Sequence, residues 1–294
     1  MSGRGGPAVS VVIPTHNRAP VLARCLDALE PQGADEVVVV DDASTDGTPA
    51  ILAERPWVRA IRRERSGGRS GAKNTGVEAA TGDVVLFVDD DAIAQPGLVD
   101  RHRAHHAEHP EPHEALLGLV TWAPEIEVTP HMHWLENGGP MFAYNDIDDP
   151  ENVTWRMLYT VNVSLKRAFL EPFDEELPIY EDTELGYRLS RRGLRLRHRP
   201  EALAHHLRTE TPERTERRME EVGAAAALLY AKHPELAEPP PPIRRVGLAK
   251  AAGARALSRL GFRGLDRRID EHRAARAFAR GYAAARAAQS PKST

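Results

Sequence analysis

The chain has 294 residues, 41% of them hydrophobic, and a formal net charge of −4 at pH 7, so it is long enough to bury a full α/β core. Its single cysteine, Cys25, excludes an internal disulfide and favours a reducing compartment. No apolar stretch is long enough to cross a membrane, and the N-terminus has no apolar signal core. These features predict a cytoplasmic protein, or one bound peripherally to the inner face of the plasma membrane.

The first predicted strand covers residues 9–14, an apolar run that ends in Pro14. Residues 21–29 then carry apolar side chains at helical spacing. Between the strand and the helix lies a polar loop that consists of Thr15, His16, Asn17 and Arg18. A strand, a polar loop and a helix in this order begin a βαβ unit.

The next elements continue the alternation of strands and helices. A second strand is predicted over residues 36–41, and Ser44, Thr45 or Asp46 can cap the helix that starts near Thr48. A third strand is predicted at residues 58–61, and a glycine-rich turn at 67–71 leads into a helix over 72–80. The run from residue 9 to about 122 predicts an α/β fold, with a Rossmann-like, mostly parallel central sheet and helices on both faces.

Three consecutive carboxylates, Asp89, Asp90 and Asp91, follow the apolar run of residues 83–88. The end of a buried strand delivers them to the edge of the sheet, where open α/β sheets bind ligands. Like charges about 4 Å apart repel by roughly 4 kcal/mol at an effective dielectric near 20, so the cluster favours proton uptake or a divalent cation such as Mg²⁺ or Mn²⁺. A solvated acidic turn explains the same acids. Because the second strand also ends in acids, we expect both groups in one crevice.

Six motifs follow one another in a characteristic order. They are Val-Ile-Pro-Thr-His-Asn-Arg at 12–18, Val-Val-Asp-Asp-Ala-Ser-Thr-Asp-Gly-Thr at 39–48, Ala-Lys-Asn-Thr-Gly at 72–76, Phe-Val-Asp-Asp-Asp-Ala at 87–92, Asn-Val-Ser-Leu-Lys-Arg at 162–167 and Tyr-Glu-Asp-Thr-Glu-Leu-Gly-Tyr-Arg at 180–188. Together they resemble the family 2 glycosyltransferases of the GT-A fold, over about residues 9–207. The resemblance implies transfer of a sugar from a nucleotide-diphosphate donor to a hydroxyl acceptor.

The resemblance also implies a donor site. Asp42 would accept a hydrogen bond from the nucleotide base, although it is also a suitable acid for the first turn of a helix. Asp89 and Asp91 correspond to the outer positions of the DxD motif, where Asp91 would coordinate the metal, Mg²⁺ or Mn²⁺. His206 would join the metal site, unless the neighbouring His205 takes that place. The remaining donor-binding residues implied are Pro14, Thr15, Asn17, Arg18, Arg69, Lys73, Asn74 and Asp90; solvated helix-end charges are the alternative for Arg69 and Lys73.

Asp182 is the implied catalytic base. In inverting members of the family, the aspartate of the Glu-Asp pair deprotonates the acceptor hydroxyl, and a positioned base of this kind is worth about 10²–10⁴-fold in rate. The same acids also suit a first helical turn that needs negative charge. The resemblance therefore implies a metal-dependent, inverting enzyme.

Aromatic residues are concentrated in the segment 122–159, between the acidic cluster and Asn162. Aromatic faces stack on sugar rings, so this segment is the candidate acceptor site, while packing of a lid onto the sheet explains the same residues equally well. The candidate acceptor-binding residues are Trp122, Trp134, Trp155 and Glu181.

Four histidines, His102, His105, His106 and His109, have the spacing of one helix face. Four imidazoles on one face would suit a transition metal. Without a carboxylate or cysteine partner nearby, the sequence favours a solvated helix instead.

The expected domain organisation is a GT-A catalytic domain over 1–238, a proline linker at 239–242 and a basic helical extension over 243–294. The catalytic domain would comprise a donor half (about 9–122), an acceptor and catalytic half (about 123–210) and a helix (about 211–237). A basic amphipathic helix suits an anionic membrane surface. Docking onto the acidic catalytic domain, of the same chain or of a homodimer partner, is the alternative. No nucleic-acid-binding motif accompanies the basic charge, so nucleic acid is not an expected partner.

Two other functions remain as alternatives. A sugar nucleotidyltransferase shares the doubly wound sheet and the acidic metal site, but is expected to carry a glycine-rich basic loop directly after the first strand. A non-catalytic membrane-surface module on the same fold would have no reason to keep Asp42, Asp91 and Asp182 together.

Overall fold

The computed structural model describes residues 5–137, 139–236 and 266–289. The chain divides into two compact units. The first takes in Met1–Ile126 and Asp146–Arg208, and the second takes in Glu127–Asn145 and Thr209–Thr294. The predicted proline linker lies outside the described residues.

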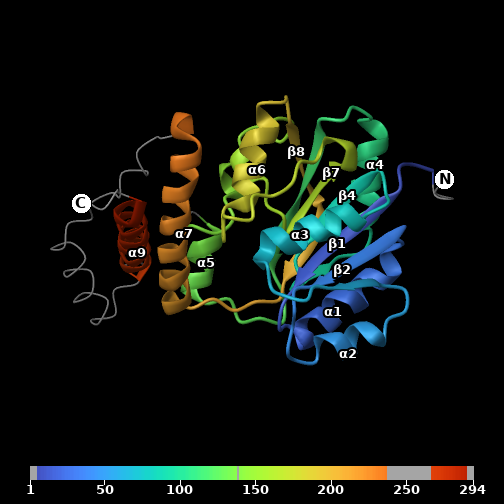
Figure 1. The fold of residues 1–294 in the computed structure, drawn as a ribbon, viewed down its shortest axis with the longest axis horizontal. Helices are drawn as coiled ribbons and strands as arrows, with labels where there is room; N and C mark the ends of the chain where they lie inside the picture. Colours follow the sequence, from blue (N-terminus) through green and yellow to red (C-terminus); the bar gives the residue numbers. More distant parts are fainter. Residues whose placement is uncertain (1–4, 138, 237–265, 290–294) are drawn as a thin grey trace. The chain divides into compact units, whose positions relative to one another are not determined.

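The first unit is built on a single sheet, which has eight strands within the described residues, in the order β3-β2-β1-β4-β7-β6-β8-β5 (Figure 1). The strands are β1 (Val9–Thr15), β2 (Glu36–Asp41), β3 (Arg59–Arg62), β4 (Val84–Val88), β5 (Ala92–Ala94), β6 (Glu114–Trp122), β7 (Asn162–Lys166) and β8 (Arg195–His206). Strands β3, β2, β1 and β4 are mutually parallel, whereas β7 and β5 run antiparallel to their neighbours. The predicted mostly parallel sheet is confirmed.

Helices α1 (Ala19–Leu29), α2 (Thr48–Ala53), α3 (Gly68–Ala79), α4 (Leu98–Glu108) and α6 (Glu181–Ser190) complete the first unit. The connection through α1 runs from β1 to β2, and the connection through α3 runs from the edge strand β3 to β4, in the opposite direction across the sheet. Because such crossovers are right-handed, α1 and α3 cover opposite faces, as predicted. Gly76 lets α3 approach β1 closely, since a Cβ there would lie 2.4 Å from Val12 Cγ1.

The glycine-rich turn differs from the expectation. Helix α3 begins at Gly68 rather than at residue 72, so most of the predicted turn forms the first helical turn. The chain enters α3 through a left-handed backbone conformation at Gly68, with φ of 70°, which glycine adopts without strain.

The prediction of a solvated histidine helix is wrong. Helix α4 packs on β4, β6 and β8, and His102, His105 and His106 are buried. His102 contacts Ser164 Oγ at 2.7 Å and Asn162 Oδ1 at 3.0 Å. Ring-sized polar side chains can enter a core when their nitrogens find partners there, and β7 provides those partners.

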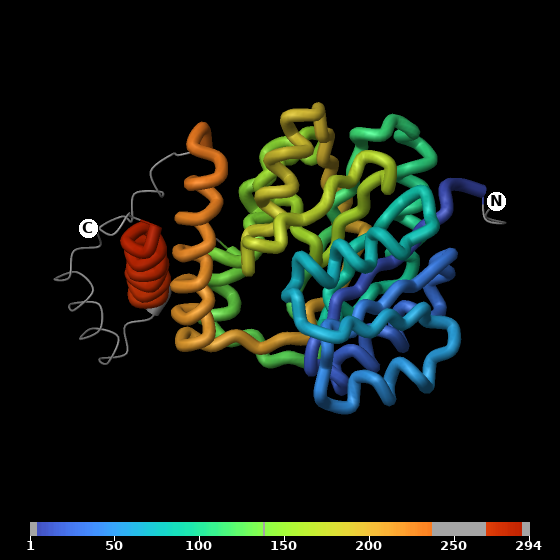
Figure 2. The backbone as a smooth tube through the Cα atoms, viewed as in Figure 1, coloured from blue at the N-terminus to red at the C-terminus, as the bar shows by residue number. Residues whose placement is uncertain are grey.

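The second unit contains α5 (Pro130–Glu136), α7 (Pro212–Lys232) and α9 (Asp266–Gln289). Figure 2 shows α7 and α9 side by side. Glycines make their close approach possible, because a Cβ on Gly223 would lie 2.0 Å from Phe278 O and one on Gly281 would lie 1.9 Å from Glu220 O. His131 of α5 joins all three helices, with Asp270 Oδ2 at 2.7 Å and Thr215 Oγ1 at 2.9 Å.

The helical character of the C-terminal extension is confirmed over α9, and residues 243–265 lie outside the described residues. Arg273 contacts Glu216 at 3.0 Å, and Arg280 contacts Glu220 at 3.0 Å. These pairs support the alternative in which the extension docks onto the same chain, while membrane binding stays a prediction. Within the described ranges, no helix combines the length and the apolar character needed to cross a membrane.

The shorter 3₁₀ turns are η1 (Glu30–Gln32), η2 (Tyr144–Asp146), η3 (Trp155–Met157), η4 (Arg167–Phe169) and η5 (Pro234–Leu236).

Candidate functional site

A cavity of about 330 Å³ lies at the carboxyl ends of β1, β2 and β4. Its walls include Asp42 and all three acids of the 89–91 cluster, so the two acidic strand ends meet in one crevice. Three basic side chains face the same space, those of Arg18, Arg69 and Arg208, and Lys73 contributes to the wall. The further predicted residues in the lining are Pro14 and Thr15. A hollow with opposed acidic and basic groups suits a diphosphate held with a cation.

Arg18 and the acidic cluster neutralise each other. Its Nη2 bonds to Asp91 Oδ2, and its Nε lies 3.5 Å from Asp90 Oδ1. Thr15 Oγ1 donates to the other oxygen of Asp90 at 2.7 Å. Burial, together with the charge of Asp91, raises the pKa of Asp90 to about 7. Asp90 therefore takes up a proton more readily than Asp91.

Asp91 and His206 form the candidate metal site. His206 Nε2 lies 3.0 Å from Asp91 Oδ1, and both side chains are buried. Burial by itself would raise the pKa of Asp91, but the bond and charge of His206, with Arg18 and Arg208 nearby, hold that pKa well below its ordinary value. An ionised carboxylate beside an imidazole is a donor set that suits Mn²⁺.

The described residues contain no group of three or more His, Cys, Asp or Glu side chains arranged around a metal position. This does not conflict with a nucleotide-bound ion, because such ions take most of their oxygens from phosphate and water and one or two from carboxylates. Asp89 lines the cavity without completing a three-residue set. His205 points elsewhere, since its Nδ1 lies 3.0 Å from Thr121 Oγ1.

The carboxylate of Asp42 is occupied by the loop that leads into α3. Oδ2 accepts from Ser66 Oγ at 2.6 Å and from Gly68 N at 2.9 Å. Oδ1 accepts from Gly67 N at 3.0 Å and lies 3.1 Å from Arg63 Nε. A carboxylate has about four lone-pair sites, so the four contacts leave no free site, and the predicted nucleotide base would have to displace one of these donors.

Two predicted donor-binding amides hold loops in this structure. Asn17, with φ of 54°, accepts from Thr45 N at 2.7 Å and from Asp46 N at 3.3 Å. Asn74 bonds both backbone groups of Phe173, from Nδ2 to O at 3.0 Å and from N to Oδ1 at 2.7 Å. Neither asparagine is among the lining residues of the cavity.

Lys73 turns from the cavity wall toward α6. Its Nζ lies 2.7 Å from Glu181 Oε1 and also donates to Thr160 Oγ1. Asp182, the predicted base, follows Glu181 in the first turn of α6, and its Oδ1 accepts from Thr183 N at 2.7 Å. Asp182 is half-buried and does not line the cavity.

The three predicted acceptor tryptophans are separated. Trp122 is buried and stacks on His206, with ring centroids 5.8 Å apart and planes at 10°. Trp155 is partly exposed and lies 5.4 Å from the ring of Tyr187. Trp134 is buried in the second unit, beside His131. Of the three, Trp155 is the partly exposed one, and the Arg156 guanidinium lies over its ring, 4.4 Å from the centroid.

Several residues of the site were missed by the sequence argument. Arg63 and Ser66 bind Asp42, Thr160 binds Lys73, and Arg208 lines the cavity. Ser66 precedes the predicted glycine-rich turn, Arg208 lies two positions after His206, and Thr160 lies two positions before the motif at 162–167, so proximity to a motif was an available signal. For Arg63 the sequence carries no such signal.

Comparison with known sequences adds to this geometry. Residues 10–151 match the family model described as Glycosyl transferase family 2. The chain is 33% identical over 222 residues to validoxylamine A glucosyltransferase of Streptomyces hygroscopicus subsp. jinggangensis, an alignment covering 64% of this chain and 52% of that protein. It is 28% identical over 255 residues to pre-mycofactocin glycosyltransferase of Mycobacterium tuberculosis, covering 81% and 51%. The chain thus spans about half the length of these curated relatives.

Solved structures share the fold. Mannosyltransferase PcManGT from Pyrobaculum calidifontis, in complex with GDP-Man and Mn²⁺, has a TM-score of 0.64 at 20% identity and covers 95% of this chain and 88% of its own. Residues 1–349 of S. aureus TarS have a TM-score of 0.55 at 19% identity, covering 97% and 93%. These likenesses confirm the predicted fold class.

Proposed function

We propose, from the match of residues 10–151 to the model of glycosyl transferase family 2 and from the GT-A fold of the chain, that the protein transfers a sugar from a nucleotide-diphosphate donor to a hydroxyl acceptor, with a divalent metal and inversion at the anomeric carbon. The observation that carries the proposal is the meeting of Asp42, the 89–91 acids and Arg69 around one cavity. The solved neighbours with bound GDP-Man and UDP-GlcNAc support a donor of this class.

Donor binding uses charge on both sides of the cavity. Arg69 and Arg208 offer guanidinium groups suited to phosphate oxygens. Asp42 accepts a hydrogen bond from the nucleotide base after one of the loop groups that now donate to its carboxylate moves aside. Thr15 fixes Asp90 through its hydroxyl and thereby shapes the wall opposite the guanidinium groups.

Asp91 and His206 would hold the divalent ion, with Asp89 nearby. The ion would neutralise the negative charge that develops on the departing diphosphate. Arg18 bonds to Oδ2 of Asp91, whereas His206 contacts Oδ1, so the Arg18 side chain must shift when a cation takes Oδ2. The Mn²⁺ bound by the neighbouring mannosyltransferase structure supports this assignment.

Asp182 is the proposed base for the acceptor hydroxyl. It sits at the N-terminal end of α6, where the helix dipole favours the ionised carboxylate. A single in-line displacement assisted by such a base inverts the anomeric carbon. We place the acceptor beside the partly exposed ring of Trp155, where a sugar or other apolar face would stack once the Arg156 side chain moves off the ring.

The proposal is tested by binding first and chemistry second. Thermal unfolding is measured with UDP, GDP, dTDP and CDP, each with and without Mn²⁺. Ligand at 100 times its dissociation constant stabilises by about 2.7 kcal/mol, so one diphosphate should raise the melting temperature in a metal-dependent way. The matching nucleotide sugar is then assayed for donor consumption. No stabilisation by any of the four would reject the proposed donor class.

A further inference from the structure

A buried ion pair joins helices α3 and α6. Nζ of Lys73 lies 2.7 Å from Oε1 of Glu181, and the two side chains are 3% and 4% exposed. The same ammonium donates to Thr160 Oγ1 and lies 5.2 Å from the ring centroid of Phe173. These contacts direct the lysine charge to the first turn of α6.

Glu181 is ionised in this environment. Burial by itself raises the pKa of the Glu181 carboxyl, but the charge and hydrogen bond of Lys73, with Arg69 farther off, outweigh burial and lower it. Asp182 is the next residue, and Tyr180 before it has the uncommon φ of 69°. Backbone in that region is strained for a residue with a side chain, and persists only when its surroundings hold it.

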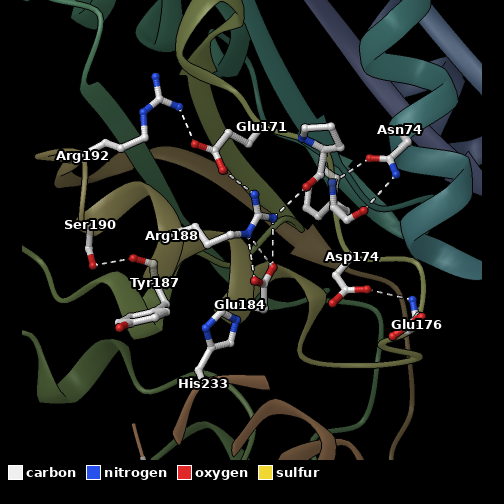
Figure 3. Close-up of polar contacts among 12 residues, drawn as sticks. Asn74, Glu171, Asp174, Glu176, Glu184, Tyr187, Arg188, Ser190, Arg192 and His233 are labelled. Atoms are coloured by element: carbon white, nitrogen blue, oxygen red, sulfur yellow. Dashed lines mark hydrogen bonds and ion pairs between the residues drawn. The ribbon is translucent and has the colours of Figure 1, made fainter. Parts of the chain in front are cut away.

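The body of α6 is held separately, as Figure 3 shows. Arg188 bonds Glu184 at 2.8 Å and donates to Pro172 O at 2.7 Å, and it also contacts Glu171. Asn74 of α3 forms hydrogen bonds to the backbone O and N of Phe173, the residue after Pro172 (Figure 3). This network fixes the helix one turn beyond Asp182. The Lys73–Glu181 pair connects α3 to the first turn itself.

We propose that Lys73 is a positioning residue, which sets the place of the Asp182 carboxylate through its ion pair with Glu181 rather than by binding the donor diphosphate. The proposal rests on the proposed function, in which Asp182 is the base. It assigns Lys73 an effect on turnover and little effect on donor affinity, although the residue forms part of the cavity wall.

The chemistry of buried pairs makes this testable. Removing one partner leaves an uncompensated buried charge, whereas removing both leaves none. Lys73→Met should therefore destabilise the protein and disturb α6. The double variant Lys73→Met/Glu181→Met should recover stability without recovering the position of Asp182. A purely structural lysine would recover turnover and stability together.

The experiment uses the full chain with four variants: Lys73→Met, Lys73→Arg, the double variant, and Arg103→Met as a control. Arg103 is another buried cation, 4% exposed and paired with Asp35 at 3.0 Å, on helix α4 away from the cavity. Affinity for UDP and GDP is measured by calorimetry with Mn²⁺. Turnover is measured as hydrolysis of UDP-glucose and GDP-mannose. Hydrogen exchange is followed at the amides of residues 181–184.

We expect Lys73→Met and the double variant to lose about 10²-fold in kcat, the cost typical of a displaced catalytic group, with the nucleotide dissociation constant unchanged. The amides of residues 181–184 should exchange faster in both, and Lys73→Arg should restore part of the rate and of the protection. Arg103→Met should be less stable but keep kcat.

Two results would overturn the proposal. Loss of nucleotide affinity in Lys73→Met equal to the loss of turnover would make the lysine a phosphate ligand. Full turnover in the double variant would make the pair merely structural. The exchange measurement needs no ligand, so it tests the link to α6 even if the wild type binds none of UDP, GDP, dTDP and CDP, a result that would instead reject the proposed donor class.

Discussion

His206 and Asp91 lie in contact, with Nε2 and Oδ1 3.0 Å apart, although 115 positions separate them in the chain. Strand pairing explains the contact, because β5 and β8 are antiparallel and place Ala92 opposite His206. Trp122 stacks on the outer face of the imidazole and limits its rotation. The geometry of the candidate metal site is therefore set by the sheet rather than by a flexible loop.

Replacing Asp91 by alanine should weaken metal-dependent nucleotide binding, because the carboxylate is the one hard oxygen ligand that His206 orients. EDTA should have the same effect on the wild type. Calorimetry of the preferred nucleoside diphosphate with and without Mn²⁺ measures both. Equal nucleotide affinity in the presence and absence of the metal would exclude a metal role for the pair.

Asp42→Asn should weaken nucleotide binding and loosen the loop at residues 63–68. The amide nitrogen of asparagine would face N–H groups that now donate hydrogen bonds to the carboxylate. Each lost charge-assisted hydrogen bond should cost roughly 1–3 kcal/mol of free energy. Urea unfolding gives the stability change and calorimetry gives the affinity change. Ser66→Ala is a matched control, since it removes one donor and leaves the carboxylate in place; it should not reduce affinity if the base replaces that donor.

Asp182→Asn should lower turnover by about 10²-fold or more, because a neutral amide does not accept the acceptor's proton. Donor affinity should stay near the wild-type value, since Asp182 does not line the cavity. The product's anomeric configuration, read by NMR, is an independent check. Retention of configuration, or wild-type turnover in the variant, would remove Asp182 from the mechanism.

Stability should fall as the pH drops from 7 to 5. Burial lowers the pKa of His102 from 6.5 to about 4, so the unfolded chain binds a proton in this window and the folded chain does not. Because the unfolded state then holds more protons, the free energy of unfolding decreases with falling pH, by about 2 kcal/mol for this residue. His102→Gln should show a smaller decrease in urea unfolding at the two pH values, and His133→Gln, at an exposed position, should match the wild type. Equal pH dependence in all three proteins would contradict the assignment.

Gly281→Leu should separate α9 from α7. Even a Cβ at this position would lie 1.9 Å from Glu220 O, so the helices must move apart, and overpacking of this kind costs typically 1–3 kcal/mol. Limited proteolysis should then cleave the C-terminal region faster than in the wild type. Ala283→Leu, at an exposed position of the same helix, is the control and should resist cleavage like the wild type.

The sequence by itself determined strands β1 to β4 and the helices between them, apart from the start of α3, and it determined the chemistry of the edge where these strands end. Runs of β-branched residues that end in acids place those acids at the carboxyl end of a parallel sheet, because strand direction and the right-handed crossover leave few other arrangements. The strand pattern alone therefore predicts that Asp42 and Asp89–Asp91 lie in one crevice. The ordered motifs added the resemblance to family 2 glycosyltransferases.

Only the tertiary structure decided which partners the polar side chains meet. The spacing of His102, His105 and His106 gives one helix face, but burial of that face depends on Ser164 and Asn162, which lie about sixty positions away. Lys73 reads locally as a phosphate ligand, yet it pairs with Glu181 across 108 positions. Local sequence fixes backbone periodicity, whereas a charged or polar group is satisfied by whichever partner the packed sheet brings within hydrogen-bonding distance.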